Sequence, residues 1–276
     1  MNKIILDKII KCALEEDVFN YDITSVHTIP QNNSSRAVVK IKSAGIICGL
    51  DVAKRVFEII DPNIKFVKKF NDGDSVKAGD IAAEIEGNTR SLLLGERTAL
   101  NFMQRMSGIA TLTSEFCKVI KGTNARIADT RKTAPGLRFV DKYSVECGGG
   151  TNHRYCLSDG VLIKDNHITA SGGIKNVLNS VKGKIPHTIK IEIEASNIAQ
   201  AIEALEYGAD IIMLDNMGIE DMKKAVELIN GRALIEASGG VSLDTIRSIA
   251  ETGVDIISVG ALTHSVKAMD ISMKII

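Results

Sequence analysis

The second half of the chain alternates between two hydrophobic patterns. Short apolar runs, each ending in a polar residue or glycine, are typical of buried parallel strands, and they occupy residues 125–129, 161–164, 189–194, 211–215, 233–238 and 254–260. Stretches with helical periodicity separate the last four, at residues 198–207, 218–229 and 243–252. This βα alternation predicts a parallel sheet covered by helices. The six runs are fewer than the eight strands of a complete barrel, so either two strands are hidden between residues 130 and 160 or the barrel is incomplete.

The first part of the chain has shorter and more varied elements. The pattern predicts helices at residues 3–16 and 51–60, a turn at 21–25, and strands at 36–43, 45–48, 64–70 and 81–86. The second helix is predicted to be capped by Asp51 and to end at Asp61-Pro62. Residues 90–120 are strongly helical, and Gly95 and Ser107-Gly108 predict a division into two helices.

These patterns predict two domains. An N-terminal domain is expected over residues 1–112 and a barrel domain over 113–265, with residues 266–276 able to return to the first domain. A chain of 276 residues is long enough for this arrangement.

Composition excludes several classes of partner. The formal net charge is +0, whereas general nucleic-acid or membrane-surface binders usually carry a basic excess. No segment approaches the roughly 20 apolar residues that cross a bilayer. The five cysteines form no CxxC pair, and an odd number cannot all pair within the chain, which fits a reducing compartment. We therefore expect a cytoplasmic protein that binds neither nucleic acid nor membranes.

Charged and glycine residues gather where the predicted strands end. Because active sites of parallel βα folds lie at the carboxyl ends of the strands, these residues are the candidates for chemistry. The candidates form three groups along the chain. The cationic group is Arg131, Lys132, His153, Arg154 and Lys164, and the two carboxylates are Glu194 and Asp215. The two glycine turns are Ser238-Gly239-Gly240 and Gly260. Arg and Lys suit carboxylates and phosphates, and the two acids suit a magnesium ion or ribose hydroxyls. The glycine turns could offer backbone N–H groups to a phosphate. Each feature alone has an ordinary structural explanation, but the combination indicates a site for anionic ligands.

Long motifs in the chain resemble one known family, quinolinate phosphoribosyltransferase, the decarboxylating nicotinate-nucleotide pyrophosphorylase. The resemblance runs nearly end to end and rests on YDITS, GERTALNFMQRMSGIAT, ADTRKTAPGLR, KYSVECGGGTNHR, LSDGVLIKDNHI, IEIE, IIMLDN, EASGG and SVGALTHS. It implies an α/β fold with an N-terminal α/β sandwich domain and an incomplete six-stranded α/β barrel. It also implies a homodimer, in some members a hexamer, with active sites shared between subunits.

The resemblance further implies substrates and residue roles. Quinolinate would be held by Arg131, Lys132, His153, Arg154 and Lys164, with Arg97 from the neighbouring subunit. Phosphoribosyl pyrophosphate would be held by Glu194, Asp215, Ser238, Gly239, Gly240, Gly260 and His264. Glu194 and Asp215 would bind Mg²⁺, and Lys132, Lys164, Glu194 and Asp215 would serve catalysis. The reaction would yield nicotinate mononucleotide, pyrophosphate and CO₂ in NAD biosynthesis.

Three alternatives remain at this point. A related phosphoribosyltransferase could act on another anionic base. A phosphate-binding barrel of the aldolase or isomerase type would need either an acid/base pair or a Schiff-base lysine, for which Lys164 is the strand-end candidate. A non-catalytic binding module would leave the strand-end carboxylates without a role.

Overall fold

The computed structural model describes residues 1–276, which form two compact units with interleaved chain segments. Unit 1 comprises residues 1–114, 133–149 and 262–276, and unit 2 comprises residues 115–132 and 150–261. The contiguous domain boundaries expected from the sequence remain a prediction. No helix is both long and apolar enough to cross a membrane.

Unit 2 is built on a six-stranded parallel sheet, as the sequence predicts. Its strands lie in the order β6-β11-β10-β9-β8-β7. Their bounds are β6 Arg126–Ala128, β7 Val161–Ile163, β8 Ile191–Ala195, β9 Ile211–Asp215, β10 Leu234–Ser238 and β11 Ile256–Ser258. β6 and β7 are the two edges, so the barrel is incomplete. The alternative of two hidden strands is wrong, because residues 130–160 contribute the helix α5 (Arg138–Cys147) and one isolated bridge between Ala128 and Thr151.

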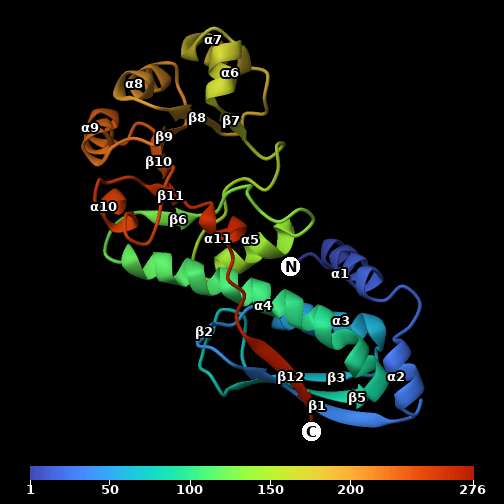
Figure 1. Ribbon diagram of the computed structural model, residues 1–276. Helices are drawn as coiled ribbons and strands as arrows, with labels where there is room; N and C mark the ends of the chain where they lie inside the picture. Colours follow the sequence, from blue (N-terminus) through green and yellow to red (C-terminus); the bar gives the residue numbers. More distant parts are fainter. The chain divides into compact units, whose positions relative to one another are not determined.

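Helices cover the outer side of this sheet (Figure 1). They are α6 Asp165–Ala170, α7 Ile174–Val181, α8 Ile198–Glu206, α9 Ile219–Ile229 and α10 Ile246–Ala250. α8 and α9 confirm the predicted periodicity, while α6 and α7 were not anticipated. α10 is shorter than the predicted 243–252, because Thr245 accepts a hydrogen bond from the Ser242 backbone in a turn that precedes the helix.

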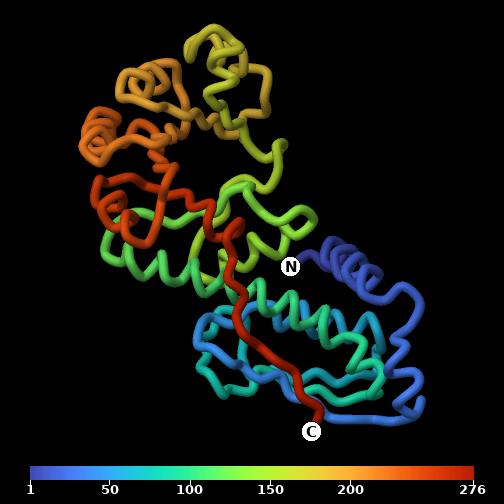
Figure 2. Tube along the Cα trace, in the orientation of Figure 1, coloured from blue at the N-terminus to red at the C-terminus, as the bar shows by residue number.

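Unit 1 contains an antiparallel sheet in the order β12-β1-β5-β3. The strands are β12 Ile271–Ile275, β1 Ser34–Ile41, β5 Ile81–Asn88 and β3 Lys65–Lys68, and a small pair joins β2 Gly45–Ile46 to β4 Ser75–Val76. Figure 2 shows the red C-terminal segment returning to the blue strand β1. The helices α1 Lys3–Asp17, α3 Leu50–Ile60 and α4 Thr89–Val119 contribute to its hydrophobic core.

The predicted division of residues 90–120 into two helices is wrong, because α4 is one continuous helix of 31 residues. Its interior glycines are sites of close packing and do not break the helix. A Cβ on Gly95 would lie 2.8 Å from the Phe57 ring, and a Cβ on Gly108 would overlap the Lys267 carbonyl oxygen. Packing therefore outweighs the helix-destabilising effect of about 1 kcal/mol per glycine.

Two predicted helix starts also differ from the structure. The N-cap of α3 is Gly49, with φ at +94°, and Asp51 lies in the first turn, where it bonds Lys68. The predicted turn at 21–25 instead begins α2 (Ile23–Thr28), because the Asp22 carboxylate accepts from the backbone N–H groups of Thr24 and Ser25.

Candidate active site

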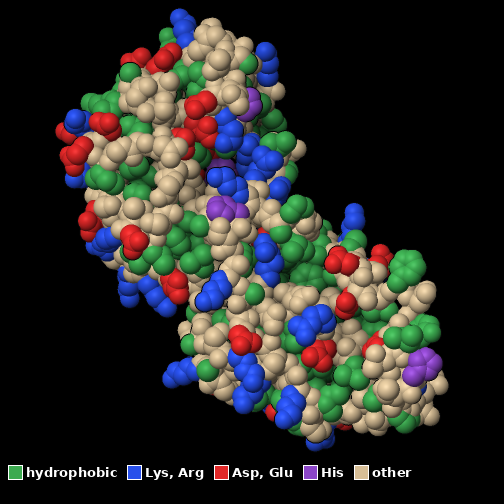
Figure 3. Space-filling model, in the orientation of Figure 1, with side chains coloured by type: hydrophobic (Ala, Val, Ile, Leu, Met, Phe, Trp, Pro, Cys, Tyr) green, Lys and Arg blue, Asp and Glu red, His purple; other side chains and the backbone are tan.

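A cavity of about 660 Å³ in unit 2 lies at the carboxyl ends of the strands. The predicted residues in its lining are Arg131, Lys132, His153, Arg154, Lys164, Glu194, Asp215, Ser238, Gly239 and Gly240. Residues from six different strand ends or connections thus reach one space. Figure 3 shows Lys, Arg and His side chains gathered at a hollow in the upper part of the view, with acidic side chains close by.

One side of the cavity is the basic wall, which we define as Arg131, Lys132, His153, Arg154 and Lys164. Arg131 and Lys132 lie in the loop after β6, and the Lys132 backbone N–H donates to Thr130 Oγ1 at 3.0 Å. Arg154 is anchored by a 2.8 Å hydrogen bond from Nη1 to the Gly160 carbonyl oxygen. Burial and then the nearby Arg131 guanidinium lower the pKa of Arg154. The wall therefore concentrates like charges that an anionic ligand would neutralise.

Two acids lie at the ends of neighbouring strands. Glu194 on β8 accepts from Lys164 Nζ at 2.5 Å, so the basic wall is linked directly to the acidic part of the site. Asp215 ends β9, and its Oδ2 accepts from the Asn216 side chain at 2.9 Å. Both carboxylates line the same cavity, which suits a shared hard cation or the hydroxyls of a sugar.

The turn after β10 requires glycine. Gly239 has φ at +95°, and a Cβ there would overlap the side chain of Asn216. Gly240 has φ at +59°, a region that glycine enters without steric cost. Asn216 is itself left-handed, with φ at +54°, and its N–H donates to the Ser238 carbonyl at 2.9 Å. Asn216 is thus a site residue that the sequence did not single out.

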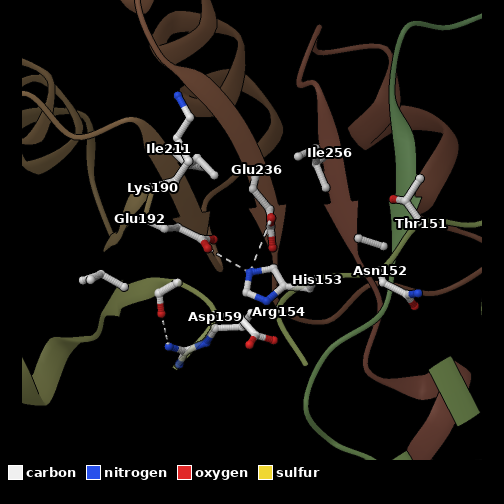
Figure 4. A pocket seen from close by; sticks show the side chains of 13 residues that line it. Thr151, Asn152, His153, Arg154, Asp159, Lys190, Glu192, Ile211, Glu236 and Ile256 are labelled. Carbon is white, nitrogen blue, oxygen red and sulfur yellow. Dashed lines mark hydrogen bonds and ion pairs between the residues drawn. The ribbon is translucent and has the colours of Figure 1, made fainter. Parts of the chain in front are cut away.

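A second group of side chains lies around a smaller cavity of about 260 Å³ that shares His153, Arg154 and Glu236 with the first (Figure 4). We call the half-buried His153 and the buried Glu192 and Glu236 the triad. His153 Nε2 lies 2.8 Å from Glu192 Oε2 and 4.0 Å from Glu236 Oε2. Burial, followed by the charge of Glu192, raises the pKa of Glu236 to about 7.

The two glutamates were missed as site residues. The sequence did offer a signal for Glu192, since Glu192 and Glu194 alternate along one strand and therefore point to the same face. Glu236 lies within β10, where an apolar residue would be the ordinary choice.

Three predicted site residues do not line the cavity. Arg97 lies on α4 in unit 1. Gly260 belongs to unit 2 and directly precedes α11 (Ala261–His264), and His264 belongs to unit 1, where its Nδ1 lies 2.7 Å from Ser265 Oγ. Their roles remain predictions.

Comparison with known proteins identifies relatives along almost the whole chain. Residues 22–107 match the family model "Quinolinate phosphoribosyl transferase, N-terminal domain", and residues 109–274 match the model of the C-terminal domain. The mitochondrial quinolinate phosphoribosyltransferase [decarboxylating] 2a of Nicotiana tabacum is 47% identical over 98% of this chain and 82% of its own length.

Bacterial relatives cover the chain equally well. The probable nicotinate-nucleotide pyrophosphorylase [carboxylating] of Bacillus subtilis is 41% identical over 100% of this chain and 95% of its own. The crystal structure of NadC from Streptococcus pyogenes superimposes with a TM-score of 0.96 and 40% identity, covering 99% of this chain and 97% of that one. With both domain models matched and the fold shared, this chain belongs to the quinolinate phosphoribosyltransferase family.

Proposed function

We propose that this protein transfers the phosphoribosyl group of phosphoribosyl pyrophosphate to quinolinate and releases CO₂, forming nicotinate mononucleotide and pyrophosphate for NAD biosynthesis. The observation that carries this proposal is the single cavity in which a basic wall, two strand-end carboxylates and a glycine turn converge. The names of the relatives from Nicotiana tabacum and Bacillus subtilis support the same reaction.

Quinolinate binds the basic wall in this proposal. Its two carboxylates need two sets of donors, and Arg131 and Arg154 can each offer a planar fork while Lys164 offers an ammonium. The mutual repulsion of Arg131 and Arg154, visible in the lowered pKa of Arg154, is relieved when a dianion enters. Lys132 lies on the same wall and can serve the dicarboxylate or the departing pyrophosphate.

Phosphoribosyl pyrophosphate occupies the opposite side. Glu194 and Asp215 provide oxygen donors for Mg²⁺, which commonly takes one or two carboxylates and completes its shell with water and phosphate oxygens. The donor set therefore fits the ion, which when bound would neutralise pyrophosphate charge. The backbone at Gly239 and Gly240 is open to the cavity and supports binding of the 5′-phosphate.

The reaction needs orientation and charge stabilisation more than a side-chain nucleophile. Departure of pyrophosphate leaves an oxocarbenium-like centre at the anomeric carbon, which the pyridine nitrogen attacks. The basic wall fixes the ring, and the acids and glycine turn fix the sugar, so that two mutually repelling anions are aligned. The newly cationic ring then stabilises the electron pair left when its neighbouring carboxylate departs as CO₂, and a proton from solvent takes the place of that carboxylate on the ring carbon.

We further propose a cytoplasmic homodimer in which Arg97 of one subunit completes the site of the other. Arg97 belongs to the helical segment GERTALNFMQRMSGIAT that carries part of the family resemblance. The five cysteines are all free, which supports a reducing compartment.

The aldolase alternative is not favoured. A Schiff-base lysine must present a free amine to a carbonyl, whereas Lys164 Nζ is engaged by Glu194 at 2.5 Å.

The first test is Arg131→Ala, assayed with quinolinate, phosphoribosyl pyrophosphate and Mg²⁺. Loss of a charged hydrogen bond in a desolvated site should raise KM for quinolinate and lower kcat/KM by at least about 2 kcal/mol equivalent. Release of CO₂ and nicotinate mononucleotide by the wild type checks the reaction itself. Near wild-type kinetics of the variant would remove Arg131 from the quinolinate site.

The shared site can be tested by mixing subunits. Arg97→Ala and Lys164→Ala homodimers should each be impaired, and mixed dimers should regain part of the activity because one of their two sites would be intact. Failure of exchanged, purified heterodimers to recover activity would contradict a site built from two subunits.

A further inference from the structure

His153 is held in place by acidic groups from three parts of unit 2. Its backbone N–H donates to Asp129 Oδ1 at 2.9 Å, and its ring nitrogen Nε2 lies 2.8 Å from Glu192 and 4.0 Å from Glu236. Figure 4 shows Glu192 and Glu236 directed at the same ring nitrogen. The two acids come from β8 and β10, with only 5% and 1% of their surface exposed.

The two glutamates are not satisfied by this contact. Glu192 Oε1 and Glu236 Oε1 are both buried without a hydrogen-bond partner in the protein. A buried polar atom without a partner typically costs about 1–3 kcal/mol, and more when the group is charged. Two such costs beside one histidine point to a role in the site beyond packing.

The hydrogen-bond chemistry of the ring restricts what His153 can do. A carboxylate can only accept, so Nε2 must carry a proton to bond Glu192. A neutral imidazole protonated at Nε2 has a lone pair at Nδ1 and would repel a carboxylate there. His153 can therefore donate to a substrate carboxylate from Nδ1 only when both ring nitrogens are protonated.

We propose that Glu192 and Glu236 are positioning residues that orient His153 and maintain it as a doubly protonated donor to a carboxylate of quinolinate. This inference rests on the assignment of His153 to quinolinate in the proposed function. In this proposal Glu192 and Glu236 act on quinolinate binding through His153 and do not need to contact the substrate.

The surrounding charges agree with a retained proton. The charged groups around the triad are the acid Asp129 and the cation Arg154, with Asp159 and Lys190 lining the same cavity, and the Ser258 hydroxyl bonds Glu236. The carboxyl groups of Asp129, Asp159, Glu192 and Glu236 outnumber the cations Arg154 and Lys190, and this excess of acids favours a proton on the imidazole. Burial, followed by repulsion from Glu192, raises the pKa of Glu236 to about 7, and a positive charge on His153 opposes that rise.

A transition-metal ion is the other occupant to consider, because one donor atom from each triad residue lies within 4.8 Å of the others. Tetrahedral Zn²⁺ with bonds of 2.0–2.1 Å separates its ligand atoms by about 3.3 Å. The 2.8 Å between His153 and Glu192 is shorter and matches a hydrogen bond. The distance between His153 Nε2 and Glu192 Oε2 therefore favours a hydrogen bond over a shared metal ion.

The experiment measures the protonation of His153 directly. ¹⁵N-histidine NMR at pH 7 should show both ring nitrogens protonated in the wild type, with the His153 signal assigned by its absence in His153→Gln. Glu192→Gln and Glu236→Gln, alone and combined, should shift this signal toward the neutral Nε2–H form. Glu194→Gln, two residues along the same strand, is the matched control and should leave the His153 signal unchanged.

Binding provides the functional readout. Calorimetric affinity for quinolinate should fall about 10- to 100-fold in the double variant, as expected for a lost charge-assisted hydrogen bond. Affinity for phosphoribosyl pyrophosphate with Mg²⁺ should change less than about twofold, which a general structural defect would not allow. Quinolinate affinity should also decline as pH rises, and in Glu236→Gln the decline should begin at a lower pH.

Three results would overturn the inference: a neutral His153 in the wild type, unchanged quinolinate affinity in the double variant, or stoichiometric metal in the purified protein that Glu236→Gln removes. Failure of the proposed site is distinguishable, because unchanged quinolinate affinity in His153→Gln would remove His153 from the quinolinate site whatever its protonation.

Discussion

Two buried acids, one in each unit, have opposite surroundings. Asp141 on α5 is 0% exposed and accepts from Arg105 Nε and Nη2 at 2.8 and 2.7 Å and from the Ala134 N–H at 3.3 Å. Glu236 is 1% exposed, yet the His153 ring nitrogen lies 4.0 Å from its Oε2, and its Oε1 has no hydrogen-bond partner in the protein. The two side chains are about equally buried, but only the carboxylate of Asp141 has hydrogen-bond partners for both of its oxygens.

From this difference we infer that Asp141 is a structural acid and Glu236 a functional one. Asp141 and Arg105 form a bidentate pair, and Arg105 also donates to the Thr263 carbonyl at 3.1 Å, so this network is internally complete. Glu236 lines the candidate site cavity, and its Oε1 accepts no hydrogen bond from the protein. Burial alone therefore does not identify a functional carboxylate, whereas burial with an unsatisfied oxygen beside a cavity does.

The same acid-to-amide change should have opposite effects on stability at the two sites. Asp141→Asn leaves the charge of the partly buried Arg105 without its carboxylate partner. Removing one partner of a buried ion pair lowers the free energy of unfolding by about 3–5 kcal/mol. Urea unfolding at pH 7 measures this loss. If the free energy of unfolding of Asp141→Asn falls by less than about 1 kcal/mol, the pair is not a structural network. The control is Glu251→Gln, which alters an exposed pair with Arg247. It should change the free energy of unfolding by no more than about 0.5 kcal/mol.

Glu236→Gln should stabilise the protein at alkaline pH. Because the pKa of Glu236 is raised from 4.5 to about 7, the folded state binds this proton more tightly than the unfolded state. Stability is therefore lost as pH rises from about 4.5 to 7, by up to about 3 kcal/mol at 1.36 kcal/mol per pKa unit. Removing the carboxyl removes that loss.

Urea unfolding of wild type and Glu236→Gln at pH 4.5 and pH 8 provides the comparison. The variant should gain on the order of 2–3 kcal/mol relative to wild type between these pH values. If Glu236→Gln is less stable than the wild type by the same amount at both pH values, Glu236 is a structural acid like Asp141. The expected gain in stability accompanies weaker quinolinate binding, a common trade-off at functional sites.

The sequence predicts the parallel sheet well, because each strand combines a short apolar run with a polar end, and the core and site lie on defined sides of such strands. The same alternation predicts Glu194 and Asp215 at one edge of the sheet. It places Glu192 on the same face as Glu194 but gives it no role, and it does not predict Glu236, since a charged residue inside a strand is explained only when the packing around it is known.

The errors within the N-terminal half have the same origin. Gly95 and Gly108 suggest helix breaks locally, but their role depends on Phe57 and Lys267, which are distant along the chain. The cap of α3 depends on the left-handed backbone of Gly49, which a nearby Asp does not reveal. Local patterns predict element types; contacts between distant segments decide where those elements start and stop.

The pairing of β12 with β1 also affects the order of folding during synthesis. Ala37 lies opposite Ile275, so the antiparallel sheet is completed by two segments that leave the ribosome far apart in time. Until β12 emerges, the β1 edge lacks this partner, and the whole of unit 2 is translated in the interval. We therefore expect this edge of the nascent N-terminal sheet to stay open to intermolecular pairing until β12 is synthesised.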